Sequence, residues 1–408
     1  VWITSLQGTE ELARAMGEDP VAEEAAGLFA RARESLNREY WMPEAGYHAF
    51  GILRGGGVND NLTAWPGTAL SWGLLDEEEA EGTLRRLATD AISSSWGARL
   101  LSTESDLYDP LHYNNGMVWP FMTGFVAWGQ YRYRRPWAGY PLLEALWRLH
   151  GDWSLGRHPE NLSGAFYQTL EATVPHQFFA SSMLVTPLAR GLLGWDPDAP
   201  RGAATLAPQP PPSWSGFMAE NLRVGDTSVR IHYERGPYEA DVVLTADGPP
   251  IELTYVQSIP LGARDIRVEG EAVEARSRQL VGRHDIQHTT TFRLEEGRPV
   301  HLGYSWEGGL AVSPFHLELD VPPGNPSLGV RILDFTRDAE GWTLVMEGDG
   351  GRAGTVLLMG EAVQADDGAV SERVLDTGRA TLEVNFPDTG ARVIRTVRLK
   401  PTAPGNSS

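Results

Sequence analysis

The chain has 408 residues, a length that predicts two or three domains at the usual size of about 100–200 residues each. Its 54 acidic and 34 basic side chains give a formal net charge of −20, so we exclude a nucleic-acid partner, whose phosphates would be repelled. The chain contains no cysteine, which excludes disulfides, thiolate metal sites and a cysteine nucleophile. A membrane-spanning helix needs about 18–20 consecutive apolar residues, and no apolar run in the chain is that long, so we expect no membrane partner.

The first part of the chain, residues 1–195, is predicted to consist of about seven helices joined by loops that carry polar and aromatic residues. A helix is expected to include Trp2, and a second begins with Asp19 as its N-cap and a proline at its first position. Pro175 is expected to start the last long helix, which Pro187 would kink. Apolar residues recur at helical spacing in the helices between, including Leu28, Phe29, Leu36, Val118, Phe121, Phe125, Leu142, Leu146 and Leu149.

The second part of the chain changes its hydrophobic period from 3.6 to 2 after a proline-rich stretch, residues 196–216, which we interpret as a linker. Residues 228–233 and 381–386 alternate apolar and polar side chains, as half-buried strands do. We therefore predict a β-sandwich at 217–313, and at 314–408 a second sandwich or a continuation of the first. Asp-Gly pairs at 247–248, 349–350 and 367–368 are predicted turns.

Two motifs in the second part resemble functional signatures but are better explained by strand structure. The glycine-rich run 348–354 lies among predicted strands with no helix after it, so it is interpreted as a turn rather than a nucleotide loop. His284 and His288 would lie about 13 Å apart along a strand, too far to share one metal ion. We therefore expect neither a metal nor another cofactor.

The informative region is 96–180, where loop segments combine aromatic residues with amides, histidines, arginine and a carboxylate. Gathered at one end of a ring of helices, they would form an aromatic-floored, hydrogen-bonding pocket that suits a neutral, polyhydroxylated ligand. A carboxylate in such a loop is a candidate general base. The runs are Trp96–Ser102, Leu107–Pro120, Gly156–Gly164 and Val174–Ala180.

These runs resemble the C-terminal half of an amylo-α-1,6-glucosidase, a debranching glucosidase of the six-hairpin glycosidases. That family has a motif of tyrosine, histidine, asparagine, glycine, serine, valine, tryptophan and proline, and here residues 113–120 read Tyr-Asn-Asn-Gly-Met-Val-Trp-Pro. A Leu-Pro-Glu motif is matched at 158–160, and the glutamine that follows it at Gln177. An Arg-Leu-Ser motif is matched at 99–102, and a proline-rich strap at 207–214. The resemblance covers about residues 1–235 and implies part of an (α/α)6 barrel, incomplete at its N-terminus, followed by β-sandwich domains.

The resemblance implies an inverting glycosidase in which Glu160 is the general base, activating a water for attack on the anomeric carbon. The general acid of the family would lie ahead of Val1, so we expect little activity from residues 1–408 alone. Asp60, Glu104 and Asp106 are alternative acids within the chain, which we rank as binding or structural residues first. A salt bridge is the alternative role for Glu160.

Candidate sugar-binding residues follow from the same motifs, and for each of them packing or loop bracing is the alternative. The sequence departs from the family pattern where subsites are expected, since Asn114 replaces a histidine and Met117 a serine. The exact sugar therefore stays open. The candidates are Trp119, Tyr113, Asn115, Arg99, His176, Gln177, Asp60, Asn61 and Trp65.

The leading prediction is an inverting glycoside hydrolase that cleaves α-glucosidic linkages of glycogen-like substrates or oligosaccharides. One alternative is another (α/α)6 α-glycosidase, of the glucoamylase or mannosylglycerate-hydrolase kind. A second is a carbohydrate-binding protein that has kept the fold without the chemistry. The expected partner is an oligo- or polysaccharide in each case, and the oligomeric state is left open.

Overall fold

The computed structural model describes residues 1–408 apart from 154, 172, 271–275, 315–320, 367–369 and 403–408. The chain divides into two compact units that interleave along the sequence, which we call the helical unit and the β unit. Within the described residues, no helix is both long and apolar enough to cross a bilayer. The helical unit comprises Val1–Tyr133, Leu142–Val185 and Asp320–Ser327, and the β unit comprises Arg134–Pro141, Thr186–Leu319 and Leu328–Ser408.

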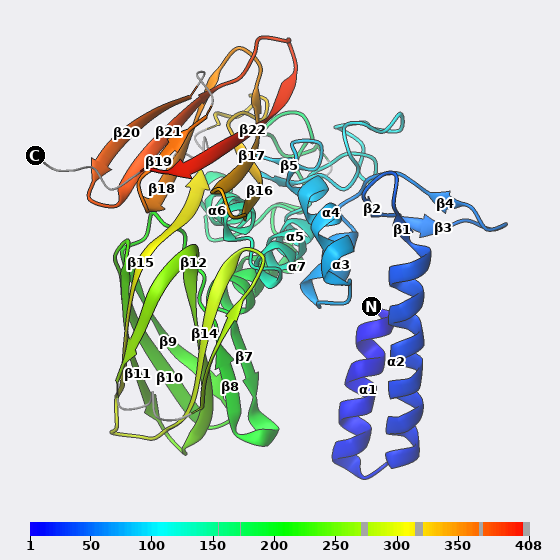
Figure 1. Ribbon diagram of the computed structural model, residues 1–408. Coiled ribbons are helices and arrows are strands. Elements are labelled where there is room, and N and C mark those ends of the chain that lie inside the picture. Colours follow the sequence, from blue (N-terminus) through cyan, green and yellow to red (C-terminus); the bar gives the residue numbers. More distant parts are fainter. Residues whose placement is uncertain (154, 172, 271–275, 315–320, 367–369, 403–408) are drawn as a thin grey trace, which may run out of the picture. The chain divides into compact units, whose positions relative to one another are not determined.

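The helical unit begins with an antiparallel pair of helices, α1 (Trp2–Met16) and α2 (Asp19–Glu39) (Figure 1). Gly17 ends α1 in the left-handed conformation, at φ 76°, which a glycine adopts without a steric penalty. The predicted helix at Trp2 is thus confirmed. Asp19 is the first helical residue rather than the cap, because the first turn of a helix has no partners for its amides and tolerates the following proline there.

Three further helices pack around a buried core: α3 (Pro66–Ser71), α4 (Glu77–Ala88) and α5 (Pro120–Arg132). α4 carries three glutamates in its first turn, where the helix dipole favours negative charge. Prolines start α3 and α5, as their missing amide donors allow. The fully buried side chains of this core include Leu70, Leu84, Leu87, Ile92, Met122 and Val126.

The last helices are α6 (Pro136–Asp152) and α7 (Phe178–Thr186), followed by a π-helical turn at Pro187–Leu192. α7 begins three residues after Pro175, so the proline does not start the helix as predicted. Pro187 changes the helix into a wider turn instead of merely kinking it, because its ring removes an amide donor from the helical ladder. Seven α-helices are present among the described residues, while their closure into an (α/α)6 ring stays a prediction.

Short hairpins connect the helices of the helical unit. Each hairpin holds a loop between helices in place with few backbone hydrogen bonds, and the rest of the loop can present side chains to a ligand. The paired strands are β1 (Trp41–Met42) with β2 (Tyr47–His48), β3 (Gly51–Ile52) with β4 (Val58–Asn59), and β5 (Ser93–Ser94) with β6 (Gly97–Ala98).

The predicted linker at 196–216 is wrong in its first half, which is built into a sheet. β7 (Trp195–Asp198) pairs antiparallel with β8 (Ala203–Leu206), and β8 pairs parallel with β12 (Ile251–Glu269). Pro197 lies in β7, a strand that pairs on one side only, where a missing amide donor is tolerated. The proline count correctly indicated the end of the helices but overstated the length of irregular chain.

The first sandwich of the β unit is organised by β12, a 19-residue strand that belongs to both of its layers. Its first half pairs with β14 and its second half with β15, so the strand turns from one layer into the other near Gly262. The order is β13-β14-β12 in one layer and β12-β15-β11-β10-β9 in the other. Bounds are β9 (Gly216–Val224), β10 (Thr227–Arg235), β11 (Glu239–Asp247), β13 (Arg276–Val281), β14 (Asp285–Leu294) and β15 (Val300–Pro314).

Side chains alternate across these strands as the sequence predicts. In β10, Val229, Ile231 and Tyr233 are buried while the residues between them face outward. They pack in one core with Leu244, Leu253 and other residues of both layers. The period-2 pattern therefore identified the buried face of the strand correctly.

The C-terminal strands extend the layer that contains β15 and also form a separate four-stranded sheet. β18 (Ala353–Gly360) pairs with the end of β15, and β21 (Arg379–Asn385) and β20 (Val370–Asp376) extend this layer. The four-stranded sheet has the order β16-β17-β22-β19. Its bounds are β16 (Arg331–Arg337), β17 (Trp342–Asp349), β19 (Val363–Ala365) and β22 (Arg392–Pro401).

Two predicted turns, at 247–248 and 349–350, begin at the last residues of β11 and β17, while the pair 367–368 lies outside the described residues. The glycine-rich run 348–354 contains the turn that joins β17 to β18, two strands of different sheets, so the predicted turn is confirmed. His284 and His288 have separate surroundings: the first ring meets Trp137, and the second meets Tyr304.

Candidate functional site

The motif-bearing segments of the helical unit are joined to one another by backbone hydrogen bonds. The amide and carbonyl of Val118 each bond to Leu162, both at 2.9 Å, and the amide of Leu100 donates to Met117 at 2.9 Å. The amide of Ser102 donates in turn to Leu62 at 2.9 Å. The loops that precede α3 and α5 and the loop before α7 therefore lie side by side. These segments thus lie together, whereas the ring of helices and the pocket at its end stay predictions.

Glu160 lies in this assembly, half-buried, with two neutral donors on one carboxylate oxygen. The Tyr113 hydroxyl donates to Oε1, and the Gln177 amide donates to the same atom from 2.9 Å. Among the described residues, Oε2 has no hydrogen-bond partner and no cation pairs with the carboxylate. The salt bridge considered as the alternative role of Glu160 is therefore not found among the residues that the structure describes.

Trp119 fixes the orientation of the Gln177 amide. Its indole Nε1 donates to the amide oxygen at 2.7 Å, which directs the amide nitrogen toward Glu160. An amide can accept through its oxygen and donate through its nitrogen, so the three side chains form one directed chain of hydrogen bonds. The sequence predicted all three residues, but it did not predict this order of contacts.

The hydrogen bond from Tyr113 has an electrostatic consequence. Donation to Glu160, with partial burial and the carboxylate charge adding to it, raises the pKa of Tyr113 to about 12. A phenol with this pKa stays protonated throughout the neutral range, so Tyr113 remains a donor to the carboxylate. Its side chain is 45% exposed, which leaves it available to a ligand.

The loop that carries Glu160 is braced from both sides. The backbone amide of Glu160 donates to the Val174 carbonyl at 2.9 Å, and the backbone amide of Gln177 donates to the His158 carbonyl at 3.0 Å. The His158 ring is buried and lies 2.8 Å from the Leu146 carbonyl through Nε2, which fixes the loop to α6. Burial lowers the pKa of His158, so the ring is neutral and can donate to this carbonyl.

Aromatic rings flank the Trp119 end of this hydrogen-bond chain. The Trp119 ring lies 6.4 Å from Trp65 and 4.8 Å from Phe121, and Phe121 lies 5.7 Å from Phe179. Trp65 is 39% exposed and Phe179 is 58% exposed, so the group presents apolar faces to a ligand. Trp65 and Trp119 were predicted, whereas Phe179 was missed because adjacent phenylalanines at a helix start also fit simple packing.

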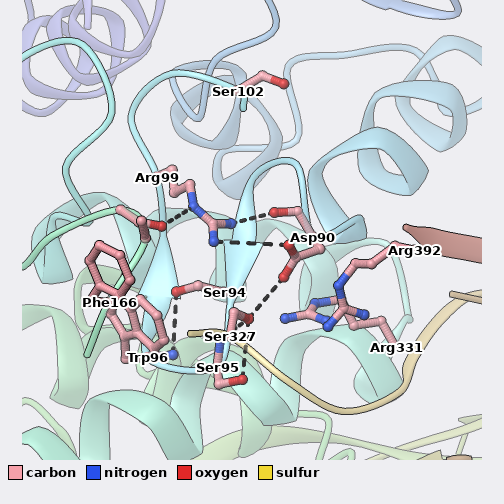
Figure 2. A network of polar contacts seen from close by, with 12 residues as sticks. Asp90, Ser94, Ser95, Trp96, Arg99, Ser102, Phe166, Ser327, Arg331 and Arg392 are labelled. Carbon is pink, nitrogen blue, oxygen red and sulfur yellow. Dashed lines mark hydrogen bonds and ion pairs between the residues drawn. The ribbon is translucent and has the colours of Figure 1, made fainter. Parts of the chain in front are cut away.

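Arg99 does not join Glu160 and instead lies buried beneath the loops. Its guanidinium donates to the backbone carbonyls of Gly164 and Asp90, and the Asp90 carboxylate lies 3.9 Å away. Figure 2 shows Arg99 beside Asp90, whose carboxylate also accepts from Ser327 at 2.8 Å. These contacts match the bracing role considered for Arg99. Sequence reasoning missed both Asp90 and Ser327. Their contact could not be predicted, because Ser327 lies 237 positions after Asp90 in the chain.

The other predicted binding residues lie in the loops but are not bonded to Glu160. The Ser105 hydroxyl donates to the side-chain oxygen Oδ1 of Asn61 at 2.6 Å, so Asn61 fixes one loop to another. Asp60 is exposed, and its backbone carbonyl accepts from the Tyr47 hydroxyl at 2.5 Å. His176 is exposed beside Gln177, and Asn115 is half-buried in the loop that carries Tyr113.

The alternative general acids differ in their surroundings. Glu104 pairs with Arg86, which matches the structural role that the sequence favoured for it. Asp106 is exposed in the segment after Ser102. Neither carboxylate shares a hydrogen bond with Tyr113 or Gln177 within the described residues, so neither belongs to the Glu160 group.

Comparison with known proteins gives structural similarities alone. No protein family model matches the sequence, and no curated protein matches it. A solved sialidase is 12% identical with a TM-score of 0.48, covering 57% of this chain and 23% of its own. A GH63 mannosylglycerate hydrolase from Thermus thermophilus is 20% identical with a TM-score of 0.38, covering 43% of this chain and 41% of its own.

An α-L-rhamnosidase from Dictyoglumus thermophilum is 11% identical with a TM-score of 0.44, covering 72% of this chain and 30% of its own. The chain thus spans less than half the length of each of these three proteins.

Proposed function

We propose that the chain carries the general-base side of an inverting glycoside hydrolase that cleaves α-glucosidic linkages of glycogen-like or oligosaccharide substrates. The observation that carries this proposal is the environment of Glu160. Tyr113 and Gln177 both donate to one oxygen of its carboxylate, and no cation neutralises it among the described residues. A carboxylate held in this way is oriented, and its second oxygen can accept a proton.

The proposed chemistry uses the two carboxylate oxygens differently. Oε1 is held by Tyr113 and Gln177, while Oε2 accepts a proton from the attacking water. The water oxygen bonds to the anomeric carbon as the glycosidic bond breaks, and a general acid on the opposite face protonates the leaving oxygen. In an inverting enzyme the two carboxyl groups are about 6.5–9.5 Å apart, which leaves room for the water.

The aromatic group beside Glu160 supports a saccharide as the ligand. Trp119 and Trp65 meet edge to face, and the exposed part of Trp65 offers a flat apolar surface. Such surfaces pack against the C–H faces of a sugar ring, while the hydroxyls of the sugar bond to polar groups nearby. The net charge of −20 favours a neutral sugar over an acidic one at this position.

A second candidate is another α-glycosidase of the (α/α)6 type, with a glucoamylase-like or mannosylglycerate-like substrate. Asn114 and Met117, where the family pattern has histidine and serine, favour keeping this candidate. Initial rates with maltose, isomaltose, a branched dextrin and mannosylglycerate distinguish the two. Release of glucose from the α-1,6 branch supports the leading proposal, and hydrolysis of mannosylglycerate alone supports the second.

The decisive experiment replaces Glu160 by Gln in the intact protein. We expect turnover to fall by about 10²–10⁴-fold, since general-base catalysis is removed, with sugar affinity nearly unchanged. Glu171→Gln is the matched control, because Glu171 is an exposed carboxylate in the same loop. Turnover is measured by glucose release, and affinity by quenching of tryptophan fluorescence.

The outcomes separate catalysis from binding. Full turnover in Glu160→Gln would overturn the assignment of the base. If the wild-type protein binds oligosaccharides but hydrolyses none of the panel, the chain belongs to a carbohydrate-binding protein. Equal losses in Glu160→Gln and Glu171→Gln would show that the loop, rather than the base, was disturbed.

A further inference from the structure

A short segment from the C-terminal part of the chain belongs to the helical unit, although strands of the β unit precede and follow it in the sequence. We call its described residues, 321–327, the strap. β15 ends at Pro314 before it, and β16 begins at Arg331 after it. The strap is therefore part of the fold that holds the candidate site, and not only a connection between two strands.

The sequence makes the strap stiff. Three of its seven residues are proline, which fixes φ and removes amide donors, so few positions could join a sheet ladder. Asn325 donates to the Pro322 carbonyl through its backbone amide and through its side-chain amide, each at 3.1 Å. Gly324 lies inside this turn at φ +84°, which a glycine adopts without a steric penalty. Such a segment has little conformational freedom to lose when it packs.

Val321 anchors the first end of the strap in a buried core beside the candidate base. It is 6% exposed and belongs to one core with Leu162 and Val118, both of which are fully buried. Leu162 lies two residues after Glu160, and Val118 directly precedes Trp119. The core that contains Val321 therefore supports the backbone on both sides of the candidate site.

The middle of the strap bonds to the loop of the candidate base through its backbone. The amide of Gly324 donates to the Tyr167 carbonyl at 3.1 Å, and the amide of Tyr167 donates to the Asn325 carbonyl at 2.9 Å. The centroid of the Tyr167 ring lies 5.7 Å from that of Trp96 and 5.5 Å from that of Trp153. Tyr167 is therefore held both by its backbone and by its ring.

Ser327 fixes the other end of the strap to the turn between β5 and β6. Its hydroxyl accepts from the Ser95 amide at 3.0 Å and donates to the Asp90 carboxylate at 2.8 Å (Figure 2). The residue after Ser95 reaches the loop of the candidate base, since the Trp96 indole donates to the Ser163 carbonyl at 2.9 Å. The turn that Ser327 fixes is thus itself bonded to this loop.

The three contacts meet on one stretch of the loop, residues 162–167, which begins two residues after Glu160. The core around Val321 supports the start of this stretch, and the middle of the strap bonds to its end. Ser327 reaches its centre less directly, through the indole of Trp96. Within the described residues no bond joins the strap to Glu160 itself, so any effect on the carboxylate passes through this stretch.

We propose that the strap positions Glu160, with Val321 and Ser327 as the positioning residues. The inference rests on the proposed function, in which Glu160 must face the attacking water. With the strap in place, residues 162–167 stay paired with Val118, and the carboxylate stays beside its two donors. Without these contacts the loop can shift, and a displacement of about 1 Å at an active site can cost about 100-fold in rate.

Hydrogen exchange of the intact protein tests the strap whether or not a substrate is known. Several amides of residues 160–168 are hydrogen-bonded, so exchange in a peptide that covers them reports how often this loop opens. We expect about tenfold faster exchange in this peptide for Val321→Ala, since lost packing makes local opening easier. Val126→Ala is the matched control, because it removes the same methyl groups from a fully buried valine in another core of the helical unit.

A second pair of variants tests Ser327 without opening a cavity. Ser327→Ala removes the hydroxyl and its bonds to Ser95 and Asp90, whereas Ser327→Thr keeps the hydroxyl and should exchange like the wild type. Val321→Ala and Ser327→Ala should each lower kcat about tenfold with little change in KM, since the sugar-binding groups stay and the base is displaced. Val126→Ala and Ser327→Thr should keep kcat near the wild-type value.

The outcomes separate this inference from the proposed function. If no sugar of the panel is hydrolysed, the proposed function fails, and the exchange comparison alone decides whether the strap holds the loop of Glu160. Equal exchange in Val321→Ala and Val126→Ala, with Ser327→Ala like Ser327→Thr, would overturn the role of the strap. Faster exchange with an unchanged kcat would overturn it as well, because the loop would then move without displacing the base.

Discussion

The helical unit and the β unit hold their polar side chains in different kinds of structure. In the helical unit, Glu160, Tyr113 and Gln177 all lie in loops, and the helices around them supply the framework. In the β unit, Arg337 ends a strand and is held against the buried ring of Trp342. The difference shows two ways to hold a side chain: by many loop hydrogen bonds, or by one rigid sheet.

The energetic basis of the two arrangements differs accordingly. Loop positions in the helical unit depend on individual hydrogen bonds, each worth about 0.5–1.5 kcal/mol. The β unit depends on large side chains buried between its layers, where truncation costs more because a cavity remains. Substitutions in the β core should therefore change stability, whereas substitutions near Glu160 should change activity first.

The largest expected effect is the loss of a buried tryptophan from the β unit. Trp342→Ala should destabilise the protein by about 3–5 kcal/mol, because the ring is fully buried and its removal leaves a cavity. Trp147→Ala in the helical unit removes a ring that is 59% exposed, so its cost should stay within about 0.5 kcal/mol. Urea unfolding of both variants measures the difference, and equal costs would contradict the contrast.

Acid sensitivity of the helical unit comes next. Burial lowers the pKa of His48 to about 4, and Nε2 has no hydrogen-bond partner within the described residues. Because the folded pKa lies below the ordinary 6.5, the stability from neutral His48 is present above pH 6.5 and is lost as the pH falls toward 4. The loss at pH 4.5 is about 2–3 kcal/mol.

Unfolding at pH 7 and pH 4.5 checks this expectation by comparing variants. His48→Gln should lose less stability between the two pH values than the wild-type protein, since its side chain cannot take up a proton. His232→Gln is the control, a histidine of the β unit that is 52% exposed. If the His48 variant loses as much stability as the wild type, the acid response arises elsewhere.

A smaller effect should follow from crowding the loops of the site. A Cβ added at Gly164 would collide with the Gly116 carbonyl and lie 2.7 Å from the Tyr108 hydroxyl. Gly164→Ala should cost about 1–3 kcal/mol, because the backbone has to shift. Gly51→Ala is the matched control, since nothing lies within 4 Å of its added Cβ. Thermal unfolding that ranks the two variants equally would contradict the close loop packing.

The smallest expected effect concerns the positioning of Gln177. Trp119→Phe keeps an aromatic ring but removes the indole donor, so the Gln177 amide is free to turn away from Glu160. We expect kcat to fall about tenfold, the equivalent of one lost hydrogen bond, with little change in melting temperature. Trp65→Phe removes no bond to Gln177 and should raise KM more than it lowers kcat. If kcat and KM change in the same way in both variants, Trp119 has no positioning role for Gln177.

Much of the fold followed from local patterns. The helix that includes Trp2 and the alternation around Val229 and Ile231 were each identified from local sequence alone. Boundaries were less accurate where proline was the signal. Pro175 precedes its helix, and Pro197 lies inside a strand. Proline is tolerated at several positions, ahead of a helix or in a strand that pairs on one side, so it does not mark one boundary.

The candidate site was predicted in part. Glu160, Tyr113, Trp119 and Gln177 come together as the motifs indicated, since each motif lies next to the start of a helix or a hairpin. Arg99 was named for sugar binding but lies buried against backbone carbonyls. A motif gives residue types in order, and cannot state which of them points inward, because that depends on chain segments far away in sequence.

Sequence alone determined the helical and strand halves of this protein, its acidic charge and the residues gathered around the candidate base, because hydrophobic period and charge are local properties. Only the tertiary structure decided that Trp119 directs Gln177 toward Glu160, and that the strap reaches the loop after Glu160. Each arrangement depends on contacts between segments tens of residues apart. Those contacts are set by how the loops and layers pack, which no local pattern encodes.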